Sequence, residues 1–535
     1  MIRRILLVVL ACVASGCTSK PSSKDSNILR LNLYTEPPSL DSRKATDATS
    51  MNVLIMLFEG LTRMGMDDKP HPAAAEKIEV SEDGRTYTFT LRDTHWSNGE
   101  PVTSDDFLYS WQSMLDPKFP GLFAYKLYVI ENAEAVKLGK LPMSALAVSA
   151  PDPKTLVVNL KYPTPYFLEL TAFPTFYPIN RISDVANPDW AAIAGSPYVS
   201  NGPFQLTKWE HESEILVTKN PHYWDASAVQ LAGLHLAMID DTTTEFYMYE
   251  MNELDWCGSP LSNLPPEFIP ALIAEGKVHF YPAAASYYYK LNTDKFPLNN
   301  DNIRRALGHS INRRDIVTHI TQAGQKPALA LVPEMPGWSP PSHLFSDGDI
   351  EGARGLFATG LAELGLTPET FPILTFSYNT NREHQKIAQA IQQQWKEALG
   401  IDVQLVHYDW KVYLSKISNQ DYQIGRMGWV GDFNDPVSFL EPFKFRNDPE
   451  KGGNNDTGWQ NSDYIAYLDA ADRELNLQKR SQILRDAEAL LIGDMPVIPL
   501  YFLMYGFMKK PYVHGVYLSS LGIADFKSAF IMRQP

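Results

Sequence analysis

The sequence predicts an α/β protein with two or three domains. Segments with strand-like alternation follow segments with helical periodicity along the whole chain, which favours layers of helix on sheet. The chain has 535 residues, and this length exceeds the usual size of a domain built around a single hydrophobic core. With 44% hydrophobic and 20% charged residues, the composition is that of a folded globular protein. Proline-rich joints, where the chain is expected to pass between lobes, occur at residues 162–165, 178–188 and 260–270.

The individual elements follow from local patterns. Alternating apolar and polar residues predict β-strands at residues 28–33, 86–91 and 402–406. Apolar residues at helical spacing predict helices at residues 107–114, 301–307, 384–399 and 475–491. Thr103 is expected to cap the first of these helices, and Gly400 is expected to end the third.

The N-terminus is typical of an exported protein. Arg3 and Arg4 precede an apolar run at residues 5–13 that is too short to span a bilayer and ends in small residues before Cys17. These residues resemble a bacterial lipobox, although Ala14 stands where Leu is usual, so we expect cleavage before Cys17 and lipid attachment to it. An ordinary signal peptide cut nearby is the alternative. The prediction is an extracytoplasmic, membrane-anchored lipoprotein.

Charge and cysteine content exclude two further possibilities. The formal net charge is −15, and loss of Arg3 and Arg4 with the leader makes it more negative, so nucleic acid is not expected as a partner. Once Cys17 is acylated, Cys257 is the single thiol left in the mature chain. We therefore expect no disulfide and a small, packed side chain at Cys257.

A segment near residue 430 is the strongest candidate for a binding site. Residues 422–436 are expected to contain a strand with opposite charges at its two ends. The residues predicted to share one face are Arg426, Gly428, Val430 and Asp432. The two charges would stand roughly 20 Å apart, and a second backbone could approach between them at Gly428. This pattern suits a zwitterionic peptide, but a structural strand whose charges point into water or pair with neighbours also fits it.

Long motifs resemble a known family. They comprise residues 75–77, 81–84, 87–92, 96–103 and 106–111, with further matches at 38–41, 201–204, 220–224, 303–307, 311–313 and 426–436. The chain resembles the OppA-like, oligopeptide-binding branch of the family 5 extracytoplasmic solute-binding proteins, which serve ABC importers. The resemblance extends over essentially the whole chain after residue 27.

The resemblance implies an α/β, periplasmic-binding-protein-like fold of class II (cluster C type). This fold is a two-lobed clamp with an extra domain, and its mixed β-sheets are flanked by helices. It assigns residues 1–16 to a signal peptide, 17–27 to the lipidated Cys and tether, 28–58, 184–285 and 503–535 to lobe I, 59–183 to the extra domain, and 286–502 to lobe II. Two crossings between the lobes would act as a hinge.

The resemblance also implies ligand roles for residues of the second lobe. Asp432 would hold a peptide's ammonium, while Gly428 and Val430 would bond its backbone. Arg426 would pair with the carboxylate of shorter peptides, since its planar guanidinium suits that group. His384 would receive the carboxylate of longer peptides, although such a residue is often simply exposed on a helix.

Four more residues match ligand-contacting positions of the family. Trp410 and Trp429 would form walls of side-chain pockets, although aromatic residues beside a strand are usually core. Thr46 and Ala48, on the first lobe, would pair with the other edge of the peptide.

Two departures from the family pattern concern the same cleft. Leu503 stands where relatives have a Tyr that touches the peptide. Around the position of Thr321, relatives carry a Lys that helps to hold one class of peptide terminus, whereas this chain has no Lys there, although His319 is near. Preferred peptide length is therefore expected to differ from that of the enterobacterial proteins.

The predicted function is capture of short oligopeptides between the lobes and delivery to an ABC permease and ATPase complex, by a monomer. The same fold could instead carry dipeptides, murein tripeptides or another small solute, and competition by N-acetylated peptide would discriminate. An exported hydrolase is the competing class, but His211-Glu212-Ser213-Glu214 lacks the second His of an HExxH pair. We predict no catalytic residue, no metal and no cofactor.

Overall fold

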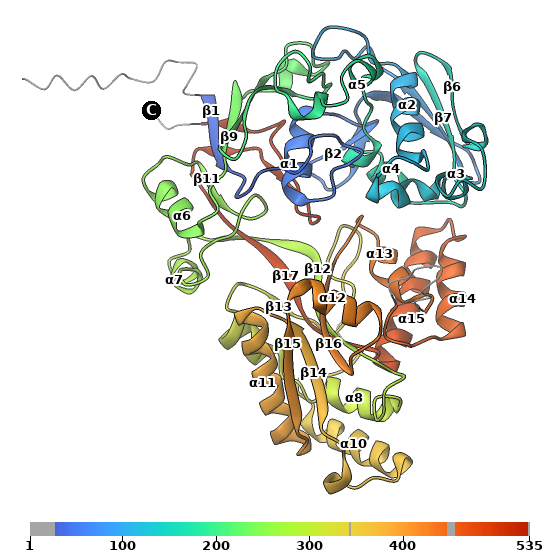
Figure 1. Ribbon diagram of the computed structural model, residues 1–535, viewed down its shortest axis with the longest axis vertical. Helices are drawn as coiled ribbons and strands as arrows, with labels where there is room; N and C mark the ends of the chain where they lie inside the picture. Colours follow the sequence, from blue (N-terminus) through green and yellow to red (C-terminus); the bar gives the residue numbers. More distant parts are fainter. Residues whose placement is uncertain (1–26, 342–343, 447–454, 533–535) are drawn as a thin grey trace, which may run out of the picture.

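The computed structural model describes residues 27–341, 344–446 and 455–532. It contains two bodies joined by two long neighbouring strands, β12 (His279–Leu291) and β17 (Val497–Lys509) (Figure 1). We call residues 27–278 and 510–532 the upper body and residues 292–496 the lower body. The leader, Cys17 and most of the tether lie outside the described residues.

The upper body holds two four-stranded sheets. The first has the order β1 (Ile28–Asn32), β10 (Gly233–Ala237), β9 (Glu214–Lys219), β8 (Phe204–Glu210). The second has the order β4 (Ala75–Val80), β5 (Thr86–Leu91), β7 (Thr155–Asn159), β6 (Val148–Asp152). Its main helices are α1 (Ala48–Leu57), α2 (Ser104–Leu115), α5 (Arg181–Ala186), α6 (Thr242–Glu250) and α7 (Ile269–Ala274), and a 3₁₀ segment, η2, covers Leu122–Val129.

A mixed seven-stranded sheet organises the lower body and extends into the upper body at residues 256–258. Its order is β11 (Trp256–Gly258), β17, β12, β16 (Ile424–Val430), β14 (Leu374–Asn379), β15 (Val403–Tyr408), and β13 (Lys326–Pro327) also pairs with β17. The main helices of this body are α8 (Asp301–His309), α10 (Ile350–Leu364), α11 (Arg382–Leu399), α12 (Trp410–Ser418), α13 (Val437–Leu440), α14 (Ser462–Ala471) and α15 (Leu477–Asp494). Among the described residues, no helix is both long and apolar enough to cross a bilayer.

Most predicted elements are confirmed within a few residues. The strands appear as β1, β5 and β15, and the helices as α2, α8, α11 and α15. Thr103 is the N-cap of α2 in a capping box with Asp106, and Gly400 ends α11 with a φ of 74°. Cys257 is a buried free thiol, as expected.

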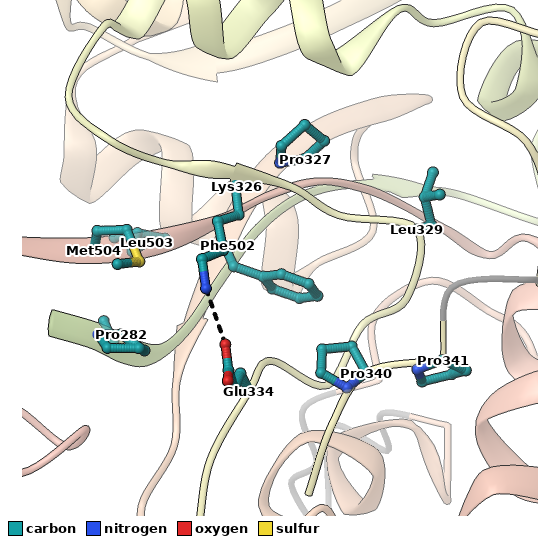
Figure 2. Close-up of a pocket in the computed structure, with 11 residues that line it drawn as sticks. Pro282, Lys326, Pro327, Leu329, Glu334, Pro340, Pro341, Phe502, Leu503 and Met504 are labelled. Atoms are coloured by element: carbon teal, nitrogen blue, oxygen red, sulfur yellow. Dashed lines mark hydrogen bonds and ion pairs between the residues drawn. The ribbon is translucent and has the colours of Figure 1, made fainter. Parts of the chain in front are cut away.

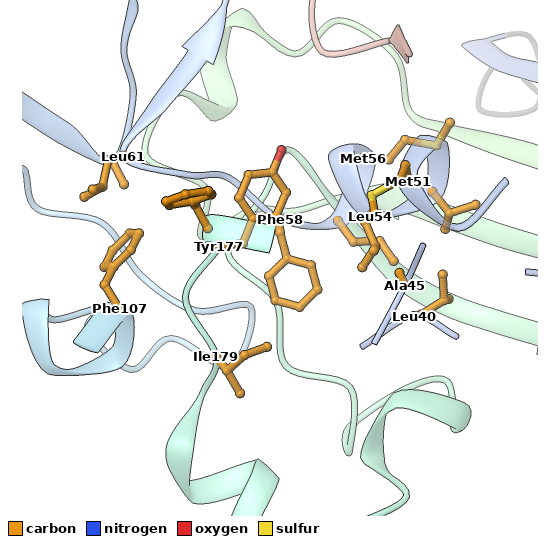
Figure 3. Close-up of a cluster of buried hydrophobic side chains, with 14 of the residues drawn as sticks. Leu40, Ala45, Met51, Leu54, Met56, Phe58, Leu61, Phe107, Tyr177 and Ile179 are labelled. Atoms are coloured by element: carbon orange, nitrogen blue, oxygen red, sulfur yellow. The ribbon is translucent and has the colours of Figure 1, made fainter. Parts of the chain in front are cut away.

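Two large cores stabilise the two bodies. The first contains residues from 29 to 261 and from 507 to 529, so a single core runs through most of the upper body. Figure 3 shows part of it, where Met51 and Leu54 of α1 lie near Phe58 and Tyr177. The second core contains residues from 284 to 501 and belongs to the lower body. The boundary between the two cores falls within the paired strands β12 and β17, which run from one body to the other.

Candidate functional site

Strand β16 has an edge that is only partly paired. Antiparallel β12 pairs with β16 over residues 424–430, whereas parallel β14 pairs with it at Ile424 and Gly425. Gly431 N donates to Ala284 O of the β12 side at 2.8 Å, and Arg426 O accepts from Tyr413 Oη on the other side at 2.6 Å. Because backbone groups alternate along an antiparallel strand, Arg426, Gly428 and Val430 direct theirs away from β12. Gly428 and Val430 lie beyond the β14 pairing, so another strand can add there.

Asp432 does not continue this strand, which corrects the prediction that it shares a face with Arg426. β16 ends at Val430, where its regular antiparallel pairing with β12 also ends, opposite Ala285. Beyond that point Asp432 N donates to Ser438 Oγ at 2.8 Å. Asp432 therefore lies on a loop, just after the strand that carries Arg426, Gly428 and Val430.

The carboxylate of Asp432 is paired with a lysine of the upper body. Lys126 Nζ lies 2.9 Å from Asp432 Oδ1, and Tyr125 Oη donates to the same oxygen at 2.9 Å. The side chain of Lys126 is 1% exposed, whereas that of Asp432 is 24% exposed. Burial lowers the pKa of Lys126, and the Asp432 charge opposes this shift.

Lys126 and Tyr125 were missed by the sequence reasoning. Both belong to η2, whose sequence is mostly apolar, and a single Lys inside such a segment is the signal that could have found them. A buried lysine needs a partner, and here that partner is more than 300 residues further along the chain.

A cavity of about 630 Å³ lies beside this ion pair, between the upper body and the lower body. Its aromatic lining consists of Tyr125, Tyr128, Tyr162, Tyr166, Trp429, Phe433 and Phe445. Its charged lining consists of Lys126, Asp432, Glu441 and Asp472. Burial raises the pKa of Glu441 and Asp472, while nearby Lys444 opposes this. A wide pocket with aromatic walls and several charges can hold large, varied side chains.

At the opposite end of β16, Arg426 lies beside Tyr287, which in turn contacts His384. The guanidinium of Arg426 lies 4.6 Å from the centre of the Tyr287 ring, and its Nε is buried with no hydrogen-bond partner among the described residues. Tyr287 Oη is hydrogen-bonded to His384 Nδ1 at 3.2 Å. Burial, helped by the Arg426 charge, lowers the pKa of His384 to about 4. The structure thus brings Arg426 and His384 together, and a buried donor without a partner can take a carboxylate.

The tryptophans occupy different settings. Trp410 is the first residue of α12 and is 49% exposed, so it is not core. Trp429 lines the large cavity, and its Nε1 is buried without a hydrogen-bond partner among the described residues. Thr46 and Ala48 are exposed at the start of α1, in the upper body, on the other side of the boundary from β16 (Figure 1).

Of the two departures from the family pattern, Thr321 lies in the lower body and Leu503 lies on β17, which joins the bodies. Leu503 lines a separate, mostly apolar cavity of about 220 Å³ beside the paired strands β12 and β17. Figure 2 shows this cavity, with Lys326 paired to Glu334 at 2.9 Å across its mouth. Thr321 Oγ1 donates to Gln325 Oε1 at 2.9 Å.

Comparisons with known proteins decide the family. A sequence model of the bacterial extracellular solute-binding proteins, family 5 (middle), matches residues 69–450. The chain belongs to this family. Family 5 is a family of solute-binding proteins with the two-lobed clamp fold, and the mixed sheets and two bodies described above have that architecture. Its members are extracellular solute-binding proteins, not a family of enzymes.

Individual members of family 5 are similar over nearly the whole chain. The oligopeptide-binding protein OppA of Bacillus subtilis is 45% identical over 532 residues, covering 98% of this chain and 97% of that protein. The unliganded open form of the murein tripeptide binding protein MppA is 30% identical, with a TM-score of 0.82, covering 95% of this chain and 98% of its own. Haemophilus influenzae OppA in complex with the peptide RPPGFSPFR is 29% identical, with a TM-score of 0.73 and coverage of 95% and 99%.

Proposed function

We propose that this family 5 protein captures short oligopeptides, of about three to five residues, in extended form along the open edge of β16. The observation that carries the proposal is this edge, where the backbone groups of Gly428 and Val430 point away from β12 beyond the β14 pairing. Main-chain hydrogen bonds require no particular side chains, so such a site can serve many sequences. The similarity to the oligopeptide-binding protein OppA supports this reading.

The charged groups at the two ends of the edge would bind the peptide termini. Asp432 would take the ammonium, because its side chain is still partly exposed and both of its upper-body contacts use Oδ1. Arg426 would take the carboxylate of short peptides, and His384 that of longer ones. The distance between the two ends would set the preferred length.

Side chains of the peptide would enter pockets with aromatic walls. Trp429 lines the large cavity beside Asp432, and Trp410 is exposed at the start of α12. Water in a cavity of about 630 Å³ can mediate contacts with different side chains. Thr46 and Ala48 would bond the other edge of the peptide when the bodies close.

We assign the lobes as the sequence suggested: residues 28–58, 184–285 and 503–535 to lobe I, 59–183 to the extra domain and 286–502 to lobe II. The second core, within residues 284–501, supports the last boundary. Lobe I and the extra domain share one core, so they would move as one body against lobe II.

Delivery would require an anchor and a transporter. Cys17 would be lipidated, hold the protein at the outer face of a membrane, and leave the monomer free to present peptide to an ABC permease and ATPase complex. A Cys17→Ser variant should be released into the soluble fraction and should lose incorporation of labelled fatty acid.

Murein tripeptide is a second candidate ligand, favoured by the similarity to MppA. Isothermal titration calorimetry on the purified protein separates the two candidates. Ala-Ala-Ala and Ala-Ala-Ala-Ala-Ala should bind, whereas free alanine should not. If only murein tripeptide bound, the peptide edge would be specialised for that ligand and the oligopeptide proposal would be wrong.

A further inference from the structure

The negative charge of Asp432 is already balanced before any ligand arrives. Lys126 Nζ contacts Asp432 Oδ1 at 2.9 Å and Asp432 O at 3.4 Å, and Tyr125 donates to the same Oδ1. The side chain of Asp432 is 24% exposed, so a ligand can still reach its other oxygen. Any ligand group that binds here therefore meets an ion pair, not an isolated carboxylate.

Lys126 is also held in place. Its Nζ lies 4.8 Å from the centre of the Phe123 ring, 5.3 Å from that of Tyr125 and 4.8 Å from that of Phe173. These ring faces stabilise a cation, and the side chain is 1% exposed. Lys126 is thus a fixed positive charge of the upper body at the site that Asp432 supplies from the lower body.

The charge balance at this site depends on the ligand. A peptide ammonium that joins the pair leaves one carboxylate between two cations, and the repulsion between the cations offsets part of the attraction to Asp432. An uncharged end, such as an N-acyl amide, leaves the pair balanced. The cavity of about 630 Å³ that both residues line gives an acyl group room.

We infer that Lys126 extends the ligand range of this receptor to peptides whose amino terminus carries no charge, such as N-acylated peptides. The inference rests on the proposed function and deepens it. In a site without Lys126, an uncharged end would leave the partly buried Asp432 without a cation beside it, which disfavours the blocked peptide. Lys126 removes that penalty, so it determines specificity for the first group of the peptide.

The test compares Ala-Ala-Ala with N-acetyl-Ala-Ala-Ala by isothermal titration calorimetry. In the parent protein the acetylated peptide should bind with a Kd less than about tenfold above that of the free peptide. Lys126→Met keeps an unbranched side chain of similar length between the rings but removes the charge. In this variant the ratio of the two Kd values should rise at least about tenfold, because only the free ammonium can now neutralise Asp432.

One comparison variant and one control separate charge from shape. Tyr125→Phe removes the hydroxyl contact to Asp432 and keeps both charges, so it should change the ratio less than Lys126→Met does. Lys140→Met removes an exposed lysine of the same domain and should leave the ratio unchanged. Glu441 and Asp472 line the same cavity but are present in all variants, so their effects cancel in the ratio.

Each outcome decides the matter. If the acetylated peptide binds the parent protein with a Kd more than about tenfold above that of the free peptide, the inference is wrong, and this measurement needs no variant. If Lys126→Met folds, as circular dichroism would report, and leaves the ratio unchanged, the inference is wrong as well. If the free peptide binds and only the ratio fails, the proposed function stands. If neither peptide binds to the parent protein, the proposed function falls and takes this inference with it.

Discussion

Lys126 in the upper body and Asp432 in the lower body form an ion pair, with Nζ and Oδ1 2.9 Å apart, beside the open edge of β16. The pair does two things at once. It connects the two bodies next to the proposed ligand site, and it sets the charge that the first group of a peptide meets. Changes at Asp432 are therefore expected to affect binding more than changes at other carboxylates of the lower body.

Asp432→Ala should weaken binding of Ala-Ala-Ala by on the order of 3–5 kcal/mol, because the ammonium would be buried without a partner beside the remaining Lys126 charge. Calorimetric titration gives the change in affinity, and circular dichroism checks the fold. Asp421→Ala is the matched control, since Asp421 is 70% exposed and pairs with Lys416. Equal affinity of the Asp432 variant and the parent would show that Asp432 does not hold the ammonium.

Arg426→Lys should weaken binding of tripeptides by about 1.5–3 kcal/mol, because an ammonium cannot reproduce the two parallel hydrogen bonds of a guanidinium. A tripeptide with a C-terminal amide should lose affinity in the parent and be nearly insensitive to the variant. Arg382→Lys, at an exposed position in the first turn of α11, is the control. The role of Arg426 would be refuted if the acid and the amide responded alike.

Peptides that reach His384 should bind with uptake of protons. The pKa of His384 is lowered to about 4 in the empty site, and a peptide carboxylate beside the ring would raise it. The complex then holds more protons than the free protein above pH 4, so affinity for pentapeptides should rise as pH falls from 7 toward 5.

Titration at pH 6 in two buffers with different ionisation enthalpies measures this uptake. Glu383, whose pKa is raised by burial, lies near the same Arg426 charge and can also contribute. His384→Gln isolates the histidine part and should bind pentapeptides with reduced uptake. Identical uptake in the variant would assign the protons to other groups.

The backbone edge can be tested at Val430, whose side chain is 54% exposed. Val430→Pro removes the N–H that points away from β12, and a lost backbone hydrogen bond should weaken peptide binding by about 0.5–1.5 kcal/mol. Val430→Ala keeps the N–H and serves as control. If both variants bound peptide equally well, the edge of β16 would not be the docking strand.

Local patterns predicted the elements that carry the site, but not how the site is closed. Strands β1 and β5 and helices α2 and α11 follow from periodicity and capping that act over a few residues. The position of Asp432 was predicted wrongly, because β16 ends where its pairing with β12, a tertiary partner, ends.

The contacts of the proposed binding residues could not be predicted from local sequence patterns either. Lys126 meets Asp432 from 306 positions away, and Tyr287 meets His384 from 97 positions away. Such pairs form only when two bodies or two elements pack, so neither spacing nor composition reveals them. The resemblance to a family supplied the predicted roles, and the structure supplied the Lys126 counter-charge.

The measurement that tests the central claim most directly is mass spectrometry of the cargo that co-purifies with the chain from Thr18 onward, expressed in a peptide-rich cytoplasm and released by mild denaturation. The account predicts a set of short peptides of varied sequence, mostly three to five residues long. An empty site, or cargo made only of non-peptide solutes, would contradict capture of oligopeptides along β16.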